Sequence, residues 1–277
     1  MDKIVFDKEF FNIKDTLCCG QLFRFKPYGD GYLVFAEDKC AYLYEAGDAS
    51  VIETEYKKYF ENYFDLSRDY SVIFAAAENS GEKILAEAAA LSKGVRILNQ
   101  NPLEALYSFI VSQNNNIPRI QKTIEALCAA YGARRNGMVD YYAFPAPADL
   151  KDATAADYKK LGLGYRAEYL ETLTAEILNG FDPVALESLP SARLYEELMK
   201  IKGVGAKVAN CVTLFGYHKT DSFPVDTWIK KYYTDDLHGN LTDVKKITDY
   251  FIGKYGENAG YFQQYLFYYK RTLEKTL

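Results

Sequence analysis

The sequence predicts an α+β protein in which a small antiparallel sheet precedes a larger, mostly helical part. Short segments near the N-terminus alternate between apolar and polar residues, whereas from residue 101 onward apolar residues recur every three or four positions. The strands therefore come first and the helices follow, which is the order typical of α+β proteins. We expect an antiparallel sheet domain with flanking helices at residues 1–95 and a helical domain at residues 96–277.

The strands are expected where apolar side chains alternate over about four residues. These segments are residues 22–25, 32–35 and 41–44, and turn-forming residues separate them at 29–31, 37–39 and 47–48. This spacing predicts an antiparallel meander.

Helices are expected from about Tyr56 onward. Residues 82–91 form an alanine-rich stretch followed by Gly94, a residue suited to a helix C-terminus. Further along, helical spacing relates Ile117, Ile120, Ile124 and Leu127, and again Leu194, Leu198 and Ile201.

The composition excludes several classes of protein. With 277 residues, 49% of them hydrophobic, the chain is long enough to bury sizeable cores. It has no apolar run close to the roughly 20 residues of a membrane span and opens on mixed polar sequence, so we expect a cytoplasmic protein, associated with the nucleoid in a bacterium. Five scattered cysteines form neither a disulfide framework nor a metal-binding pattern, and we interpret them as reduced thiols: Cys18, Cys19, Cys40, Cys128 and Cys211.

The overall charge argues against a nucleic-acid partner, but its distribution is less clear. The formal net charge is −5 and the pI is about 5.3, whereas DNA affinity comes largely from basic side chains. Between Glu196 and Lys231 six lysines face four acids, a local balance of +2. That excess is small and, taken alone, indicates a solvated face.

The most informative segment is Gly203-Val204-Gly205, which joins two apolar-periodic helices. Glycines at both positions permit a positive φ and close approach, so the amides of Val204, Gly205 and Ala206 could point together at a phosphate oxygen. An ordinary tight turn between helices explains the same pattern.

Two residues near this turn suggest chemistry. A lysine is a nucleophile only as the neutral amine, and the first turn of a helix together with partial burial favours that form, which suits Lys207. Cys211 lies one turn later on the same face, where it could exchange a proton with the amine. Asp226 precedes a helical start, so it is expected to cap that helix, and a carboxylate fixed there could stabilise positive charge on a sugar. A solvated first-turn lysine remains the alternative for Lys207.

Residues 202–207 together with residues 223–226 resemble the helix-hairpin-helix, Gly/Pro-rich loop and aspartate signature of the DNA glycosylase superfamily (HhH-GPD), and the lysine marks its glycosylase/lyase branch. Further segments resemble the 8-oxoguanine DNA glycosylase family, and the likeness runs from about residue 18 to 267. These segments are residues 94–98, 108–110, 114–120, 161–167 and 259–263.

The resemblance implies a role for each matching residue. Gly20 would accept a hydrogen bond from N7–H of 8-oxoguanine, Gln263 would read the Watson-Crick edge, and Phe267 and Cys211 would sandwich the flipped base. Tyr165 would wedge beside the opposite base, which Asn114, Arg119 and Arg166 would hold. From the residues alone, Gly20 also suits a strand start, and Gln263 and Phe267 suit core packing. Trp228 departs from the family, where many members carry a phosphate-contacting histidine, and Gln113 and Pro118 differ as well.

The resemblance implies a bifunctional glycosylase/AP lyase that removes 8-oxoguanine opposite cytosine through a Lys207 Schiff base. We expect a monomer whose partner is duplex DNA containing oxidised guanine, with no membrane association. No cofactor is required, although the hairpin could hold a monovalent or calcium ion through backbone carbonyls. The alternatives are a monofunctional alkylation-repair glycosylase of the same superfamily, which would lack Lys207, and a non-catalytic helix-hairpin-helix DNA-binding module.

Overall fold

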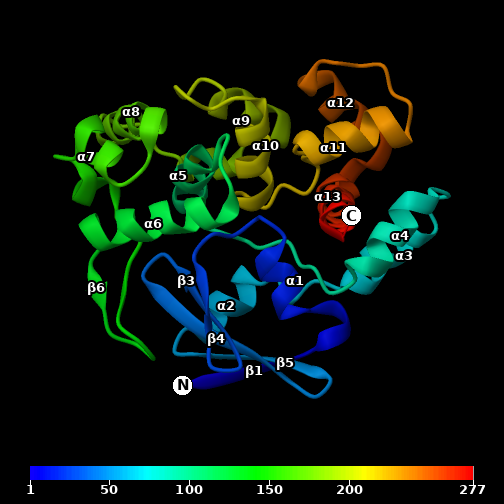
Figure 1. Ribbon diagram of the computed structural model, residues 1–277, viewed down its shortest axis with the longest axis horizontal. Coiled ribbons are helices and arrows are strands. Elements are labelled where there is room, and N and C mark those ends of the chain that lie inside the picture. Colours follow the sequence, from blue (N-terminus) through cyan, green and yellow to red (C-terminus); the bar gives the residue numbers. More distant parts are fainter. Residues whose placement is uncertain (277) are drawn as a thin grey trace.

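A computed structural model describes residues 1–276 and the side chains of residues 1–273. Its N-terminal part is a five-stranded antiparallel sheet with the order β1-β5-β4-β3-β2 (Figure 1). The strands are β1 (Asp2–Asp7), β2 (Phe25–Tyr28), β3 (Gly31–Ala36), β4 (Lys39–Ala46) and β5 (Ala49–Thr54). The predicted segments 32–35 and 41–44 lie in β3 and β4, so the predicted meander and the α+β class are confirmed.

The first predicted strand is wrong in part, because only Phe25 of residues 22–25 belongs to β2. The preceding side chains pack between the sheet and the helices instead. Phe23 is buried in the core of the helical part. Arg24 is also buried and pairs with Glu104 at 3.1 Å while donating to two backbone carbonyls. Alternating apolar character there reflects burial on both sides of an irregular segment.

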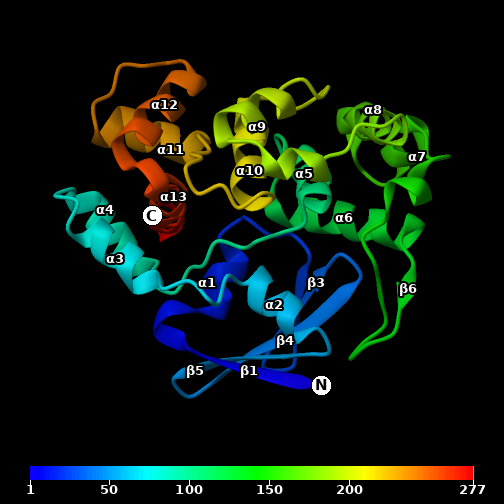
Figure 2. The ribbon, with the colours of Figure 1, turned by 180° about the vertical axis from the view of Figure 1, so that it is seen from behind.

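Short helices lie between β1 and β2 and after β5. They are α1 (Ile13–Cys18), α2 (Lys57–Tyr63), α3 (Tyr70–Glu78) and α4 (Lys83–Leu91). The predicted helix at 82–91 is α4, which Glu82 precedes as N-cap. Figures 1 and 2 show that α3 and α4 lie beside the C-terminal helix α13 (Ala259–Thr276) and away from the sheet. The division expected near residue 95 remains a prediction.

The remaining helices form the body of the molecule. They are α5 (Pro102–Ser112), α6 (Ile117–Tyr131), α7 (Ala155–Lys160), α8 (Ala167–Leu178), α9 (Ser191–Leu198), α10 (Ala206–Phe215), α11 (Thr227–Lys231) and α12 (Val244–Tyr255). A two-stranded hairpin that the sequence did not predict, β6 (Arg134–Arg135) with β7 (Tyr141–Tyr142), extends from α6 toward the sheet (Figure 1). One large apolar core fills this body, and a second, smaller core lies under the sheet.

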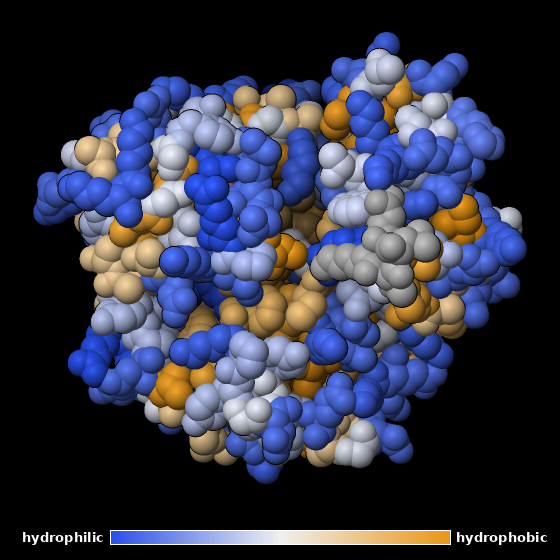
Figure 3. All heavy atoms as spheres, in the orientation of Figure 1, coloured by the Kyte–Doolittle hydropathy of each residue, from blue (hydrophilic) through white to orange (hydrophobic). Residues whose placement is uncertain are grey.

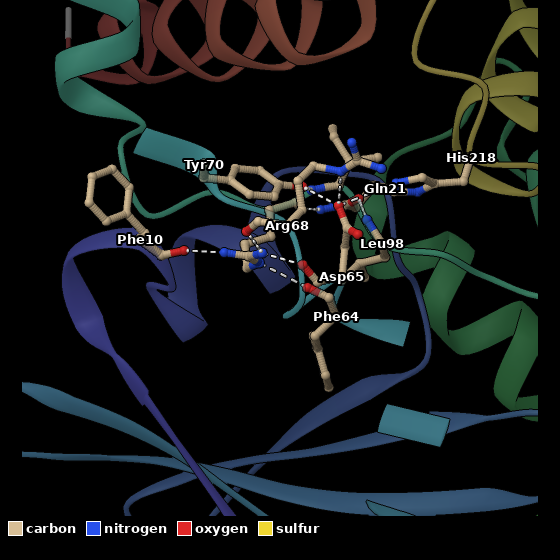
Figure 4. Close-up of polar contacts among 10 residues, drawn as sticks. Phe10, Gln21, Phe64, Asp65, Arg68, Tyr70, Leu98 and His218 are labelled. Carbon is tan, nitrogen blue, oxygen red and sulfur yellow. Dashed lines mark hydrogen bonds and ion pairs between the residues drawn. The ribbon is translucent and has the colours of Figure 1, made fainter. Parts of the chain in front are cut away.

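The fully buried Arg96 joins these two parts. Its guanidinium donates to the carbonyls of Phe64 (2.9 Å), Phe10 (2.9 Å), Arg68 (3.0 Å) and Asp65, and it stacks 3.9 Å from the ring centroid of Tyr70. Figure 4 shows how these carbonyls converge from the segments after β1 and α2. The guanidinium of Arg96 therefore holds the chain before α3 in a fixed position relative to the sheet.

The surface in Figure 3 is mainly hydrophilic, and hydrophobic atoms are visible in a hollow near its centre. Among the described residues, no helix combines the length and apolar character needed to cross a membrane.

Candidate active site

The turn between α9 and α10 places a lysine at the start of a helix. Gly203 has φ +88°, and a Cβ there would lie 2.3 Å from Cγ of Tyr169, so only glycine fits against that ring. Gly205 is the N-cap of α10, which makes Lys207 the second residue of the helix. The predicted helix-hairpin-helix geometry is therefore present.

The hairpin amides differ from the expectation in one respect. The N–H of Val204 donates to the carbonyl of Ile201 at 3.0 Å, so this amide is already used within the turn. Within the described part of the chain the amides of Gly205 and Ala206 have no hydrogen-bond acceptor. A phosphate oxygen would thus meet two amides at the positive end of α10, while Val204 keeps the turn in shape.

Lys207 is half-buried beside an aromatic cluster. Its Nζ lies 5.2 Å from the ring centroid of Phe109 on α5. Phe109 in turn stacks on Phe215 and meets the edge of Phe23. Because Phe23 comes from the N-terminal part, the amine lies where both parts of the molecule meet.

The neighbouring Cys211 is a thiol at neutral pH. Burial raises the pKa of Cys211 above its ordinary value, and the nearby Lys207 ammonium only partly opposes this effect. Burial therefore favours the protonated thiol over the thiolate at this position. Cys211 therefore does not hold Lys207 in its charged form through a thiolate.

Asp226 caps α11 as predicted. Its Oδ1 accepts the N–H groups of Trp228 (3.0 Å) and Ile229 (2.9 Å). Burial raises the pKa of Asp226, against the lowering effects of the Ile229 N–H and of Lys207. The partly desolvated carboxylate of Asp226 is thus close enough to Lys207 for their charges to interact.

Two of the proposed base-reading residues, Gly20 and Phe267, lie against each other where the loop after α1 meets α13. Gly20 has φ +88°, and a Cβ there would lie 3.4 Å from the ring of Phe267. Gln264 donates to the carbonyl of Cys19 at 2.9 Å and ties this loop to α13. Gln263 is buried and donates to the carbonyl of Pro224 at 3.1 Å, close to Asp226 in the chain. The fold thus brings Gly20 against Phe267, 247 positions later in the chain, while the role of Gln263 at the base stays a prediction.

The four residues expected at the opposite base fall into two groups. Asn114, which has φ +44°, Arg119 and Tyr165 are exposed. Arg166 is only 4% exposed and donates to the carbonyls of Gln113, Asn114 and Leu163. Its guanidinium also lies 4.5 Å from the Tyr165 ring centroid. Arg166 therefore supports the Asn114 loop here, instead of presenting free donors as we expected.

Gln113 is a residue whose role the sequence did not reveal. Its Nε2 donates to the carbonyl of Gly203 at 2.9 Å and so connects the Asn114 loop to the hairpin. The only signal in the sequence was its departure from the family pattern.

Comparison with known proteins agrees with the helix-hairpin-helix geometry of this site. The sequence profile described as 8-oxoguanine DNA glycosylase, N-terminal domain, matches residues 3–106, and that of the HhH-GPD superfamily base excision DNA repair protein matches residues 107–252, more than half of the chain. The chain belongs to the HhH-GPD superfamily.

Individual relatives agree with this assignment. The N-glycosylase/DNA lyase of Saccharomyces cerevisiae is 32% identical over 219 residues, which cover 73% of this chain and 57% of that protein. This HhH-GPD chain thus spans about half the length of the curated relatives it matches.

Two solved structures cover almost the whole chain. A structure described as MBOgg1 in complex with a low-affinity DNA ligand has a TM-score of 0.92 at 34% identity and covers 98% of this chain and 96% of its own. The Clostridium acetobutylicum 8-oxoguanine glycosylase/lyase in complex with dsDNA containing cytosine opposite to 8-oxoG has a TM-score of 0.91 at 36% identity and covers 98% of each chain.

Two further features bear on this HhH-GPD site. Trp228, where the family resemblance leads one to expect a histidine, is half-buried on α11, and Nζ of Lys231 lies 5.2 Å from the centroid of its ring. The residues that the structure describes contain no cluster of three or more His, Cys, Asp or Glu side chains able to hold a metal ion.

Proposed function

We propose that this protein is a bifunctional DNA glycosylase/AP lyase that excises 8-oxoguanine opposite cytosine from duplex DNA. The observation that carries the proposal is the half-buried Lys207 in the first turn of α10, electrostatically coupled to the capping carboxylate of Asp226. A purely structural hairpin requires neither group. The names and DNA complexes of the relatives support the same class of reaction.

The chemistry follows from these positions. The neutral Lys207 amine attacks C1′ of the flipped nucleotide, the bond from C1′ to N9 breaks, and the base leaves with its bonding electrons and takes up a proton. The carboxylate of Asp226 stabilises the positive charge that develops on the sugar. Loss of the amine protons and opening of the sugar ring give an imine at C1′. Removal of a proton from C2′ then expels the 3′ phosphate, with cleavage of the C3′–O bond.

The imine provides a direct test. Borohydride reduction during reaction with an 8-oxoguanine duplex should give a stable covalent adduct between protein and DNA, and Lys207→Gln should abolish both the adduct and base release. Base release by the parent without any adduct would indicate a monofunctional enzyme. Binding without base release would indicate a DNA-binding module, and an adduct that persists in Lys207→Gln would move the nucleophile to another amine.

In this proposal, selection for cytosine as the opposite base depends on the exposed side chains of Asn114 and Arg119. Arg119 offers several N–H donors that suit the O2 and N3 acceptors of cytosine, whereas adenine presents an amino donor. Each donor left unpaired costs about 1–3 kcal/mol, so excision opposite cytosine should exceed excision opposite adenine by about tenfold or more.

The expected effect of mutation on this ratio now differs between the two arginines. Arg119→Ala should lower the ratio of excision rates opposite cytosine and adenine, because it removes a free donor. Arg166→Ala should lower DNA affinity together with the ratio, because the loop that carries Asn114 loses its support. Equal rates opposite both bases in the parent would contradict this part of the proposal.

A structural ion at the hairpin is part of the proposal. The carbonyls of Ile201 and Gly203 each accept one hydrogen bond, from Val204 and Gln113, so each retains a second lone pair for a monovalent or calcium ion. Thermal unfolding with potassium, calcium or a bulky organic cation should show a higher Tm with the ion that binds. The same Tm in all three would argue against a site.

A further inference from the structure

Two polar atoms on α13 are buried and have no hydrogen-bond partner among the described residues. One is the acceptor Oε1 of Gln263 and the other is the donor Nη1 of Arg271. Both side chains belong to α13, with Phe267 midway between them at one helical turn from each. Buried polar atoms in folded proteins nearly always have a partner, so this pair indicates a ligand with a donor at one end and an acceptor at the other.

The guanidinium of Arg271 is held in place. Its Nη2 donates to the carbonyl of Cys18, and its Cζ lies 5.2 Å from the ring centroid of Phe267 and 5.8 Å from that of Tyr268. Because the guanidinium is a rigid planar fork, fixing Nη2 also fixes the direction of Nη1. Arg271 forms no ion pair with any described carboxylate.

Nη1 lies directly beside Gly20, since a Cβ on that glycine would be 3.4 Å from it and equally close to Phe267. The free donor, the glycine and the aromatic ring therefore border the same space. An incoming group that reaches Gly20 also reaches Nη1.

We propose that Arg271 is a second damage-reading residue, which donates a hydrogen bond to the C8 carbonyl of the flipped 8-oxoguanine. The inference rests on the proposed function and on the orientation in which Gln263 meets the pairing edge. N7 is bonded to C8, so a purine whose N7–H points at the Gly20 carbonyl carries its C8 oxygen next to that glycine, where Nη1 lies. Gln263 and Arg271 are eight residues apart, or about 12 Å along the helix. This span suits a purine with a hydrogen bond of about 2.9 Å at each end.

The contact would discriminate against undamaged guanine. Guanine carries C–H at position 8, so its entry would leave the Arg271 donor buried without an acceptor, in addition to the mismatch at the Gly20 carbonyl. Damage would therefore be recognised through both features that oxidation creates, the N7–H and the C8 oxygen.

The test is Arg271→Met, which keeps an unbranched apolar stem and removes the N–H donors. Single-turnover excision of 8-oxoguanine should fall by about tenfold to a hundredfold, as expected for a lost hydrogen bond from a charged group. Strand cleavage at a preformed abasic site should stay at the parent rate, because that substrate has no base to read. Lys270→Met is the matched control, since Lys270 pairs with Asp236 at 2.7 Å and should be dispensable for both reactions.

A modified base separates recognition from folding. 8-Thioguanine keeps N7–H but replaces the oxygen by sulfur, a weaker acceptor. The parent should excise 8-oxoguanine faster than 8-thioguanine, and this preference should shrink in Arg271→Met and be partly restored in Arg271→Lys.

The outcomes distinguish this inference from the proposed function. Parent-like excision by Arg271→Met, or an unchanged preference between the two bases, would overturn the inference alone. An equal loss of abasic-site cleavage would also overturn it, by assigning Arg271 a structural role. A parent enzyme that excises no 8-oxoguanine would overturn the proposed function, and the inference with it.

Discussion

Asp226 illustrates how one side chain can stabilise local structure and still cost the protein free energy. Its Oδ1 caps α11 through two backbone N–H groups. Burial nevertheless raises the pKa of Asp226, so the ionised carboxylate is less stable in the folded protein than in the unfolded chain. In the proposed reaction the same desolvation would strengthen its electrostatic effect on a cationic sugar.

We therefore expect Asp226→Asn to slow excision while leaving the fold intact. The amide oxygen can still cap α11, but the negative charge is lost, so single-turnover excision should fall by at least about a hundredfold. The Tm at neutral pH should equal or exceed that of the parent, because the desolvated charge is gone. Duplex affinity, measured by fluorescence anisotropy, serves as the control and should be close to that of the parent.

The pH dependence of excision and of stability in the parent should reflect the same raised pKa of Asp226. Because the pKa of Asp226 lies above its ordinary value, excision should decline on acidification before an unperturbed aspartate would be protonated. The stability cost of the charge should disappear over the same acidic range, as the pH falls through this pKa. A parent Tm well above that of Asp226→Asn at neutral pH would contradict this account.

At the residue scale, the sequence predicted where individual side chains lie in local structure better than it predicted what surrounds them. The motif placed Lys207 at a helix start and Asp226 at a cap, since both depend on local chain geometry. It could not reveal that Cys211 remains a thiol or that Arg166 is buried under backbone carbonyls, because both depend on residues distant in sequence. Arg271 escaped notice for the same reason: only the fold brings it beside Gly20.

At the scale of elements, the hairpin and the Asn114 loop form one unit. Gln113 donates from the end of α5 to the carbonyl of Gly203, and Tyr169 on α8 packs on the same glycine. Periodicity predicted the helices on each side, because each buries one face. It gave no sign of the short strands β6 and β7 or of the irregular residues 22–24, which are fixed by contacts between elements.

This connection predicts the effect of Gln113→Ala. Losing one hydrogen bond between the loop and the hairpin should weaken DNA binding by about fivefold, since such a bond contributes about 1 kcal/mol. The single-turnover rate for bound substrate should change little, because Lys207 and Asp226 keep their surroundings. Affinity is best measured in the Lys207→Gln background, with Gln121→Ala on α6 as the matched control. Parent-like affinity for Gln113→Ala would show that the loop and hairpin bind DNA independently.

At the scale of the whole molecule, the segment between the sheet and the body is hydrogen-bonded to the loop that carries Gly20. The backbone of Arg96 accepts a hydrogen bond from Gln21 at 2.6 Å, and Gln21 in turn accepts from the N–H of Leu98 at 2.8 Å. Gln21 follows Gly20 directly in the chain, so the connecting segment holds the loop that carries Gly20. Figure 4 shows Gln21 and Leu98 beside the carbonyls that surround the Arg96 guanidinium.

Arg96→Met should therefore destabilise the entire fold. Burial lowers the pKa of Arg96, because its charge is penalised in this apolar setting, and the four carbonyls offset that penalty. Methionine removes the penalty but takes this donor from the carbonyls of Phe10, Phe64 and Arg68, each loss costing about 1–3 kcal/mol. The carbonyl of Asp65 still accepts the N–H of Arg68 at 3.3 Å. We expect a net loss of at least about 3 kcal/mol and a Tm lower by about 5–10 °C.

The matched control is Arg193→Met, because Arg193 is 64% exposed and its ion pair with Glu196 should contribute less than about 1 kcal/mol. Arg96→Lys separates charge from geometry. A single amine cannot donate to the carbonyls of Phe10, Phe64 and Arg68 together, so the Tm of this variant should also be lower than that of the parent. If Arg96→Met had the same Tm as the parent, the free-energy cost of desolvating the guanidinium would equal the stabilisation that its hydrogen bonds provide. The junction between the sheet and the helical body would then depend on apolar packing alone.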